Sequence, residues 1–103
     1  MSYNYLSTKK PFQGNLFYGM KGPKVLELQC MLDELNDYYN FRKGKKLPTT
    51  GYFGDETKRF VTAFQLFVNL YPADGMVDAR THDMLEARYF NYMSNTHSRA
   101  YRG

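Results

Sequence analysis

One helical pattern occurs twice in this chain of 103 residues, and this repetition constrains the fold more than any other feature. The two copies, 36 residues apart, are Val25-x-x-Leu28-Gln29-x-x-Leu32 and Val61-x-x-Phe64-Gln65-x-x-Val68. Apolar residues at three- and four-residue spacing form one stripe of an α-helix, and a period of this size is typical of a helical unit used twice. The sequence therefore predicts two related helices, each with a glutamine beside its apolar stripe.

A glycine-containing turn is repeated as well. Its copies, 24 residues apart, are Gly51-x-Phe53-Gly54-x-x-Thr57 and Gly75-x-Val77-Asp78-x-x-Thr81. Glycine permits a positive φ, and Asp78 is a candidate N-cap, so each turn should lead into a helix. Helical spacing continues after the second turn, at Thr81, Met84, Leu85, Arg88, Tyr89 and Tyr92. We expect an all-α fold, a small three-helix bundle in which the two turns could pair as a short β-bridge.

Proline and polar residues predict where these helices begin and end. The first helix should begin near Pro23, since proline suits a first helical turn, and should end near Asn36. Residues 37–50 are rich in tyrosine and then in basic residues, which predicts a surface insertion. Pro72 should stop the second helix soon after its apolar stripe.

The chain divides into three parts. Residues 1–14 lack periodicity but carry aromatic residues, which predicts an extended N-terminal arm that packs on something. Residues 15–87 form the expected domain. Residues 88–103 are expected to hold the end of the third helix and then, from residue 94, a polar C-terminal tail.

The repeated segments, taken in their order and spacing, resemble the helical peptidoglycan-binding domain family over about residues 15–87. The segments that carry the resemblance run from Gly22 to Leu32, from Gly51 to Gln65 and from Asp74 to Thr81. The resemblance implies a non-catalytic module that binds cell-wall peptidoglycan without a cofactor. The structural motif residues that it implies are Gln29, Gly51, Phe53, Gly54, Thr57, Phe64, Gln65, Gly75 and Thr81.

Two roles are open for the polar and aromatic residues near the turns. The amides of Gln29 and Gln65 could bind a sugar or a peptide stem, but the stronger hypothesis is that they bond the backbone of the glycine turns. Loop tyrosines suit sugars, which have apolar faces and hydroxyls, yet they could equally cover a small core. The candidate ligand-binding residues are Tyr18, Tyr38, Tyr39, Tyr52, Arg59, Tyr71 and Arg80. The two arginines could pair with peptide carboxylates, although a solvated role is the simpler hypothesis.

Charge and residue chemistry weigh against catalysis, metal binding and nucleic-acid binding. The net charge is +4, but residues 15–87 hold nine Lys or Arg and ten Asp or Glu, so the excess lies at the ends. The two histidines, His82 and His97, have no metal-ligand spacing. Cys30 lies in the first helix without a neighbouring base, and we expect it in or beside the core. No segment is long and apolar enough to span a membrane.

These observations lead to two functional hypotheses. The N-terminus shows no apolar signal segment, so a protein that meets the cell wall would reach it from the cytoplasm. We therefore expect a bacteriophage virion protein, made in the host cytoplasm, in a tail or baseplate, that binds peptidoglycan and docks to other virion proteins through its terminal arms. The alternative is a structural virion protein that uses the fold only for protein–protein docking. Nucleic-acid binding through the basic loop and ends is a third and weaker hypothesis.

Overall fold

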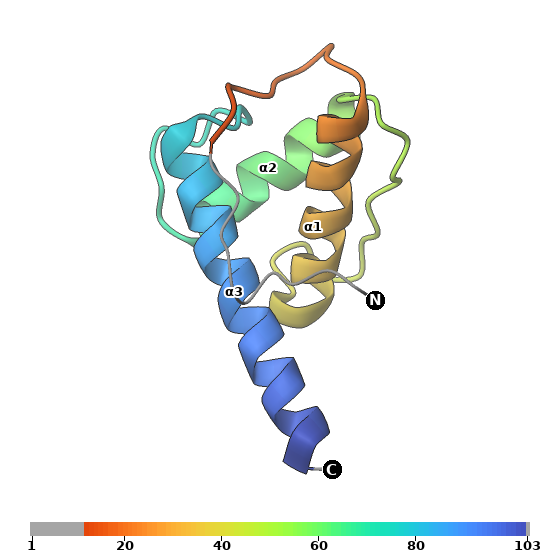
Figure 1. Cartoon of the computed structure of the whole chain (residues 1–103). Helices are drawn as coiled ribbons and strands as arrows, with labels where there is room; N and C mark the ends of the chain where they lie inside the picture. The colour runs from red at the N-terminus through yellow and green to blue at the C-terminus, as the bar shows by residue number, and fades with distance from the viewer. Residues whose placement is uncertain (1–11, 103) are drawn as a thin grey trace.

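The computed structural model describes residues 12–102, which form three helices around one core. The helices are α1 (Pro23–Tyr39), α2 (Asp55–Phe67) and α3 (Ala79–Arg102). Helix α1 packs against both α2 and α3 (Figure 1). Within the described residues there is no β-strand, and the predicted all-α three-helix fold is confirmed.

The helix ends follow from local residues. Pro23 occupies the first turn of α1 and Asp55 and Glu56 occupy the first turn of α2, where their charge is favourable to the helix dipole. Helix α1 continues to Tyr39, three residues beyond the expected end. It stops at Asn40, which adopts the left-handed conformation (φ 64°) and donates its backbone N–H to the Asn36 carbonyl at 2.7 Å.

The core is built from the repeated apolar stripes. Phe53, Phe60 and Phe64 are fully buried, and Phe53 anchors the first glycine turn in the core as the sequence predicts. The other buried apolar residues are Val25, Leu28, Leu32, Leu35, Leu47, Val61, Val77, Leu85 and Tyr89. Most of these belong to the two copies of the pattern or to the stripe of α3, so hydrophobic periodicity located the core correctly.

The two glycine turns do not pair with each other. Instead each turn forms a β-bridge with the segment that precedes α1: Val77 pairs with Leu16, and Tyr52 pairs with Lys21. The suggested bridge between the turns was therefore wrong. Residues 16–22, which show no helical periodicity, form backbone hydrogen bonds with both turns. They join the two turns into one layer across the top of the bundle (Figure 1).

Helix α3 is longer than predicted. The polar tail expected from residue 94 is helical as far as Arg102, and this part projects beyond the rest of the bundle (Figure 1). No proline or glycine interrupts the sequence from Ala79 to Arg102. Once a helix is nucleated by packing, each further residue adds a hydrogen bond at little cost, even without an apolar stripe. The N-terminal arm lies outside the described residues up to residue 11.

Tyr89 is buried, as its place in the stripe of α3 predicts, and donates its hydroxyl to Glu34 at 2.6 Å. One residue occupies a place that the sequence did not predict. Cys30 is exposed rather than in or beside the core. It lies two residues after the buried Leu28, which places it about 200° around the helix axis from the apolar stripe. No described helix is long and apolar enough to cross a membrane.

Asp78 caps α3, as the sequence predicts. Its carboxylate accepts the backbone N–H of Thr81 at 3.0 Å, and this hydrogen bond lowers the pKa of Asp78 below its ordinary value of 3.8. A lowered pKa means that the cap stabilises the fold above pH 3.8 and that this contribution is lost as the pH falls through the folded-state pKa.

We expect Asp78→Ala to reduce the free energy of unfolding by about 1 kcal/mol at neutral pH, because it removes the cap. The difference in unfolding free energy between this variant and the wild type should shrink as the pH falls below 3.8, because the Asp78 carboxylate of the wild type then becomes protonated. Urea denaturation at several pH values measures this, with Asp78→Asn as the control because its amide oxygen caps at every pH. A difference that does not change with pH would contradict the assigned role of the charge.

Candidate functional site

The first turn, residues 50–54, is held by the side chain of Gln29. The Gln29 Nε2 donates to the Tyr52 carbonyl at 2.8 Å and to Thr57 Oγ1 at 2.9 Å, and its Oε1 accepts the Gly51 N–H at 2.8 Å. One buried amide therefore fixes the turn both to α1, which carries Gln29, and to the start of α2, which carries Thr57.

The second turn, residues 74–78, is built in the same way around Gln65. The Gln65 Nε2 donates to the Met76 carbonyl at 2.9 Å and to Thr81 Oγ1 at 3.0 Å, and its Oε1 accepts the Gly75 N–H at 2.9 Å. Both glutamines make the backbone contacts that the structural hypothesis predicts. Their amide groups are occupied by the fold and are not available to a ligand.

The glycine that opens each turn has a conformation that side chains rarely adopt. Gly51 has φ 82° and Gly75 has φ 80°. In this conformation each N–H points at its glutamine, so the repeated glycine and the repeated glutamine form one structural unit.

An open groove lies between the first turn and the start of α1. It encloses about 520 Å³ and is lined by Lys21, Gly22, Pro23, Leu26, Thr50, Gly51 and Tyr52. Two of its apolar side chains are accessible, since Tyr52 is 45% exposed and Leu26 is 41% exposed. Concave surfaces with apolar walls and a few polar groups are the usual form of a small-ligand site.

Tyr18 lies beside this groove. The negative charge of Asp55, followed by the nearby Tyr52, raises the pKa of the Tyr18 phenol above its ordinary value of 10.0. The Tyr18 hydroxyl is hydrogen-bonded to Asp55, which ties this residue to the start of α2. Tyr18, Tyr52 and Asp55 thus form an exposed polar and aromatic edge next to the groove.

The glutamine-held turns and the three helices identify the type of domain. Residues 21–85 match the model of a family described as "Putative peptidoglycan binding domain". This chain belongs to the peptidoglycan-binding domain family. The match confirms the resemblance found in the sequence, and it covers both turns and the groove.

A solved structure supports this assignment. The crystal structure of the SleB N-terminal domain is similar to the chain with a TM-score of 0.61 and 31% sequence identity. The similarity covers 78% of this chain and 99% of the SleB domain. No curated protein sequence matches the chain.

In this member of the peptidoglycan-binding domain family, only two of the predicted ligand residues come together at the groove: Tyr18 and Tyr52. Tyr38 and Tyr39 belong to an aromatic cluster between α1 and α3, where Tyr38 packs edge-on against Tyr39 and Tyr92. Arg88 lies over the Tyr39 ring at 5.5 Å. This cluster covers the core, which is the second of the two roles left open by the sequence.

The side chains of the two candidate arginines make contacts within the domain. Arg59 pairs with Glu56 at 3.1 Å on the surface of α2. Arg80 donates to the Tyr71 carbonyl at 2.9 Å beside the second turn, and Tyr71 itself is exposed. Their binding roles stay predictions, and the structure does not bring them to the groove.

Five lining residues were missed by the sequence analysis: Lys21, Gly22, Pro23, Leu26 and Thr50. Leu26 carried a usable signal, because it is an apolar residue that falls outside the buried stripe of α1. The others line the groove because residues 50–52 return to the N-terminal end of α1. Helical periodicity cannot indicate this return of the chain.

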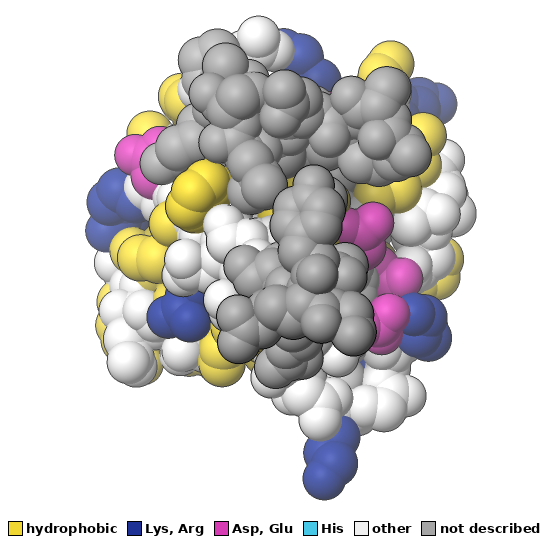
Figure 2. Space-filling model, turned by 60° about the horizontal axis from the view of Figure 1, so that its bottom comes forward, with side chains coloured by type: hydrophobic (Ala, Val, Ile, Leu, Met, Phe, Trp, Pro, Cys, Tyr) yellow, Lys and Arg dark blue, Asp and Glu magenta, His cyan; other side chains and the backbone are white. Residues whose placement is uncertain are grey.

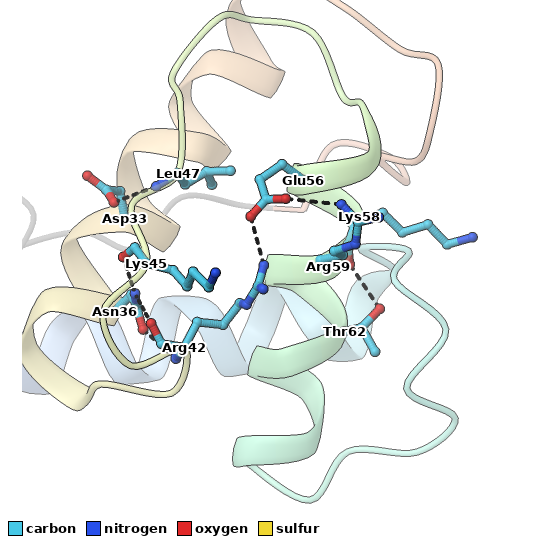
Figure 3. Close-up of polar contacts among 9 residues, drawn as sticks. All are labelled: Asp33, Asn36, Arg42, Lys45, Leu47, Glu56, Lys58, Arg59 and Thr62. Carbon is cyan, nitrogen blue, oxygen red and sulfur yellow. Dashed lines mark hydrogen bonds and ion pairs between the residues drawn. The ribbon is translucent and has the colours of Figure 1, made fainter.

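The basic loop is tied to the domain by its charges. Arg42 pairs with Glu56 at 2.9 Å (Figure 3), and its guanidinium lies 5.0 Å from the centre of the Phe60 ring. Lys46 contacts Asp33 at 3.3 Å and Asp37 at 3.2 Å. Two of the four basic residues of the loop are therefore partly neutralised, which weakens the nucleic-acid hypothesis.

Backbone contacts also fix this loop. The Asn36 amide donates to the carbonyls of Arg42 and Lys45, and its oxygen accepts the Arg42 N–H (Figure 3). On the described part of the face in Figure 2, Lys and Arg side chains are scattered with acidic side chains between them. In the part of the chain that the structure describes, no three potential metal ligands lie together.

Proposed function

We propose that this chain is a non-catalytic peptidoglycan-binding module and that it contacts the cell wall through the groove beside the first turn. Membership of the peptidoglycan-binding domain family supports the ligand. The groove supports the location, because it combines accessible apolar side chains with polar groups at the turn that Gln29 holds. The single observation that carries the proposal is the open groove formed by a turn that the family motif builds.

The chemistry of the groove suits peptidoglycan. This polymer consists of amino-sugar rings, which have apolar faces, and short peptides that carry carboxylates. Tyr52 and Leu26 offer apolar surface to either component, Lys21 supplies a positive charge, and Tyr18 adds an exposed aromatic ring. Because the groove is open, it can contact a segment of the polymer without surrounding the chain.

Co-sedimentation with purified insoluble peptidoglycan at physiological salt tests the proposal. We expect the wild-type chain to sediment with the wall and Leu26→Ser to lose most of this binding, since the variant removes an apolar wall of the groove. Leu66→Ser is the matched control, because Leu66 is 50% exposed but does not line the groove. Failure of the wild type to sediment, or equal losses in both variants, would contradict the proposal.

The virion placement stays a prediction, and with it the contacts to other virion proteins in a bacteriophage tail or baseplate. One feature favours the docking that it requires. The end of α3 projects from the bundle, and Phe90 on this helix is 40% exposed (Figure 1). Aromatic residues are common anchors of protein interfaces.

Purified phage particles test the placement. The chain should be detected in intact particles by mass spectrometry, and a chain shortened after Asn95 should fold but fail to enter them. Detection only in the soluble fraction of the lysate would exclude a virion role.

A further inference from the structure

The two turns share one construction, but the space above the turn glycine is open only in the first. We propose that the first turn is the single wall-contacting copy in this domain and that Lys58 and Thr62 close the second. This inference rests on the proposed function, because it concerns how many peptidoglycan sites the domain has.

The closing residues stand at positions equivalent to the groove. The offset of 36 residues that relates Gln29 to Gln65 also relates Gly22 to Lys58 and Leu26 to Thr62. Gly22 and Leu26 line the open groove. The second copy therefore has the long side chain of Lys58 where the first has Gly22. It has the hydroxyl of Thr62 where the first has the apolar side chain of Leu26.

The space above each turn glycine shows the effect of this exchange. A Cβ atom added to Gly75 would lie 2.6 Å from Lys58 Cγ and 2.8 Å from Thr62 Oγ1. At Gly51 the nearest atoms to such a Cβ are the Gly22 carbonyl oxygen at 3.7 Å and Leu26 Cβ at 4.0 Å. Consistent with this, Gly75 is buried whereas Gly51 is only half-buried.

Hydrogen bonding keeps the second copy closed. The Thr62 hydroxyl donates to the Lys58 carbonyl at 2.9 Å (Figure 3). This bond fixes the Thr62 side chain, whose Oγ1 lies close to the space above Gly75. The stem of Lys58 occupies the space directly above Gly75. A ligand would have to displace the Lys58 stem and break or bypass this bond before it reached the turn backbone.

The charge of the second turn also differs. Thr50 Oγ1 accepts the Tyr52 N–H at 3.1 Å in the first turn, and the Asp74 carboxylate accepts the Met76 N–H at 3.0 Å at the equivalent place in the second. The same backbone contact is thus made by a neutral group in one copy and by a negative group in the other.

A calorimetric titration counts the sites. The probe is a set of soluble disaccharide-peptide fragments released from purified walls by a muramidase. We expect one fragment to bind per wild-type chain. Two equivalent fragments per chain would overturn the inference, while no binding by wild type to fragments and no co-sedimentation with intact walls would reject the proposed function and the inference with it.

Matched variants locate the site. Tyr52 and Met76 are equivalent residues of the two turns, 24 positions apart. Tyr52→Ala should weaken fragment binding by at least about tenfold, as expected for an aromatic anchor, whereas Met76→Ala should change it by less than about twofold. Thermal melts establish that each variant is folded, and Leu26→Ser replaces Tyr52→Ala if the latter is not. Equal weakening by the two turn variants, or a larger effect of Met76→Ala, would overturn the inference.

Discussion

Replacing Phe64 with alanine is expected to lower the free energy of unfolding by about 3–5 kcal/mol. Phe64 is 0% exposed and lies at the centre of the α2 stripe, where its ring meets the Phe41 ring with a centroid separation of 5.6 Å. Removal of the ring costs its transfer free energy and leaves a cavity. The surrounding helices are held by both glutamine-bonded turns, so they cannot move together to fill it.

Urea denaturation followed by circular dichroism measures this loss. Phe90→Ala is the matched control, because Phe90 lies on a helix but is 40% exposed. The control should lose less than about 1 kcal/mol, as exposed positions usually do. A loss for Phe64→Ala as small as that of the control would contradict the core described above.

Removal of either glutamine amide is expected to destabilise the domain by about 1–3 kcal/mol, because buried partners lose their hydrogen bonds. In Gln65→Ala the buried Gly75 N–H loses its acceptor and the Met76 carbonyl loses its donor. In Gln29→Ala the same happens at the Gly51 N–H and the Tyr52 carbonyl.

Denaturation and wall binding must be measured on the same variants. Gln13→Ala serves as the control for residue type, because Gln13 is exposed, and it should leave stability within about 0.5 kcal/mol. At a temperature where the glutamine variants are folded, we expect them to bind peptidoglycan as the wild type does. A glutamine variant with full stability and no binding would show that the amide contacts the wall instead of the turn.

The helical architecture could be predicted because it depends on local patterns. The spacing of Val25, Leu28 and Leu32, and its recurrence 36 residues later, placed two helices and most of the core. The hypothesis that each glutamine bonds a glycine turn followed from burial of a polar group beside an apolar stripe. Such a group needs a partner, and the repeated turn was the nearest source of backbone donors and acceptors.

Two of the errors concern features without a local signal, and the third, at Cys30, concerns a local signal that was given too little weight. The helical end of α3 has no apolar stripe, because it projects from the bundle and has no core to face. The bridges from Leu16 and Lys21 to the two turns join residues far apart in the sequence. Cys30 was misplaced because residue type was given more weight than its angular position on the helix.

The candidate site was predicted only in part. Tyr18 and Tyr52 meet at the groove, but Tyr38 and Tyr39 face the core-covering cluster at α3. A tyrosine near a predicted loop can serve either role, and only the packing of the helices decides between them. The difference between the open and the closed turn likewise depends on which side chain of the preceding helix lies above the glycine.

A two-dimensional amide NMR titration tests the central claim most directly. A chain of 103 residues is small enough for residue-specific assignment, and soluble disaccharide-peptide fragments of peptidoglycan serve as the ligand. We predict that the largest shift changes fall on the groove residues Leu26, Thr50, Gly51 and Tyr52, with little change at Gly75 and Met76. Shift changes confined to the second turn or to α3, or a spectrum that the fragments leave unchanged, would contradict the account.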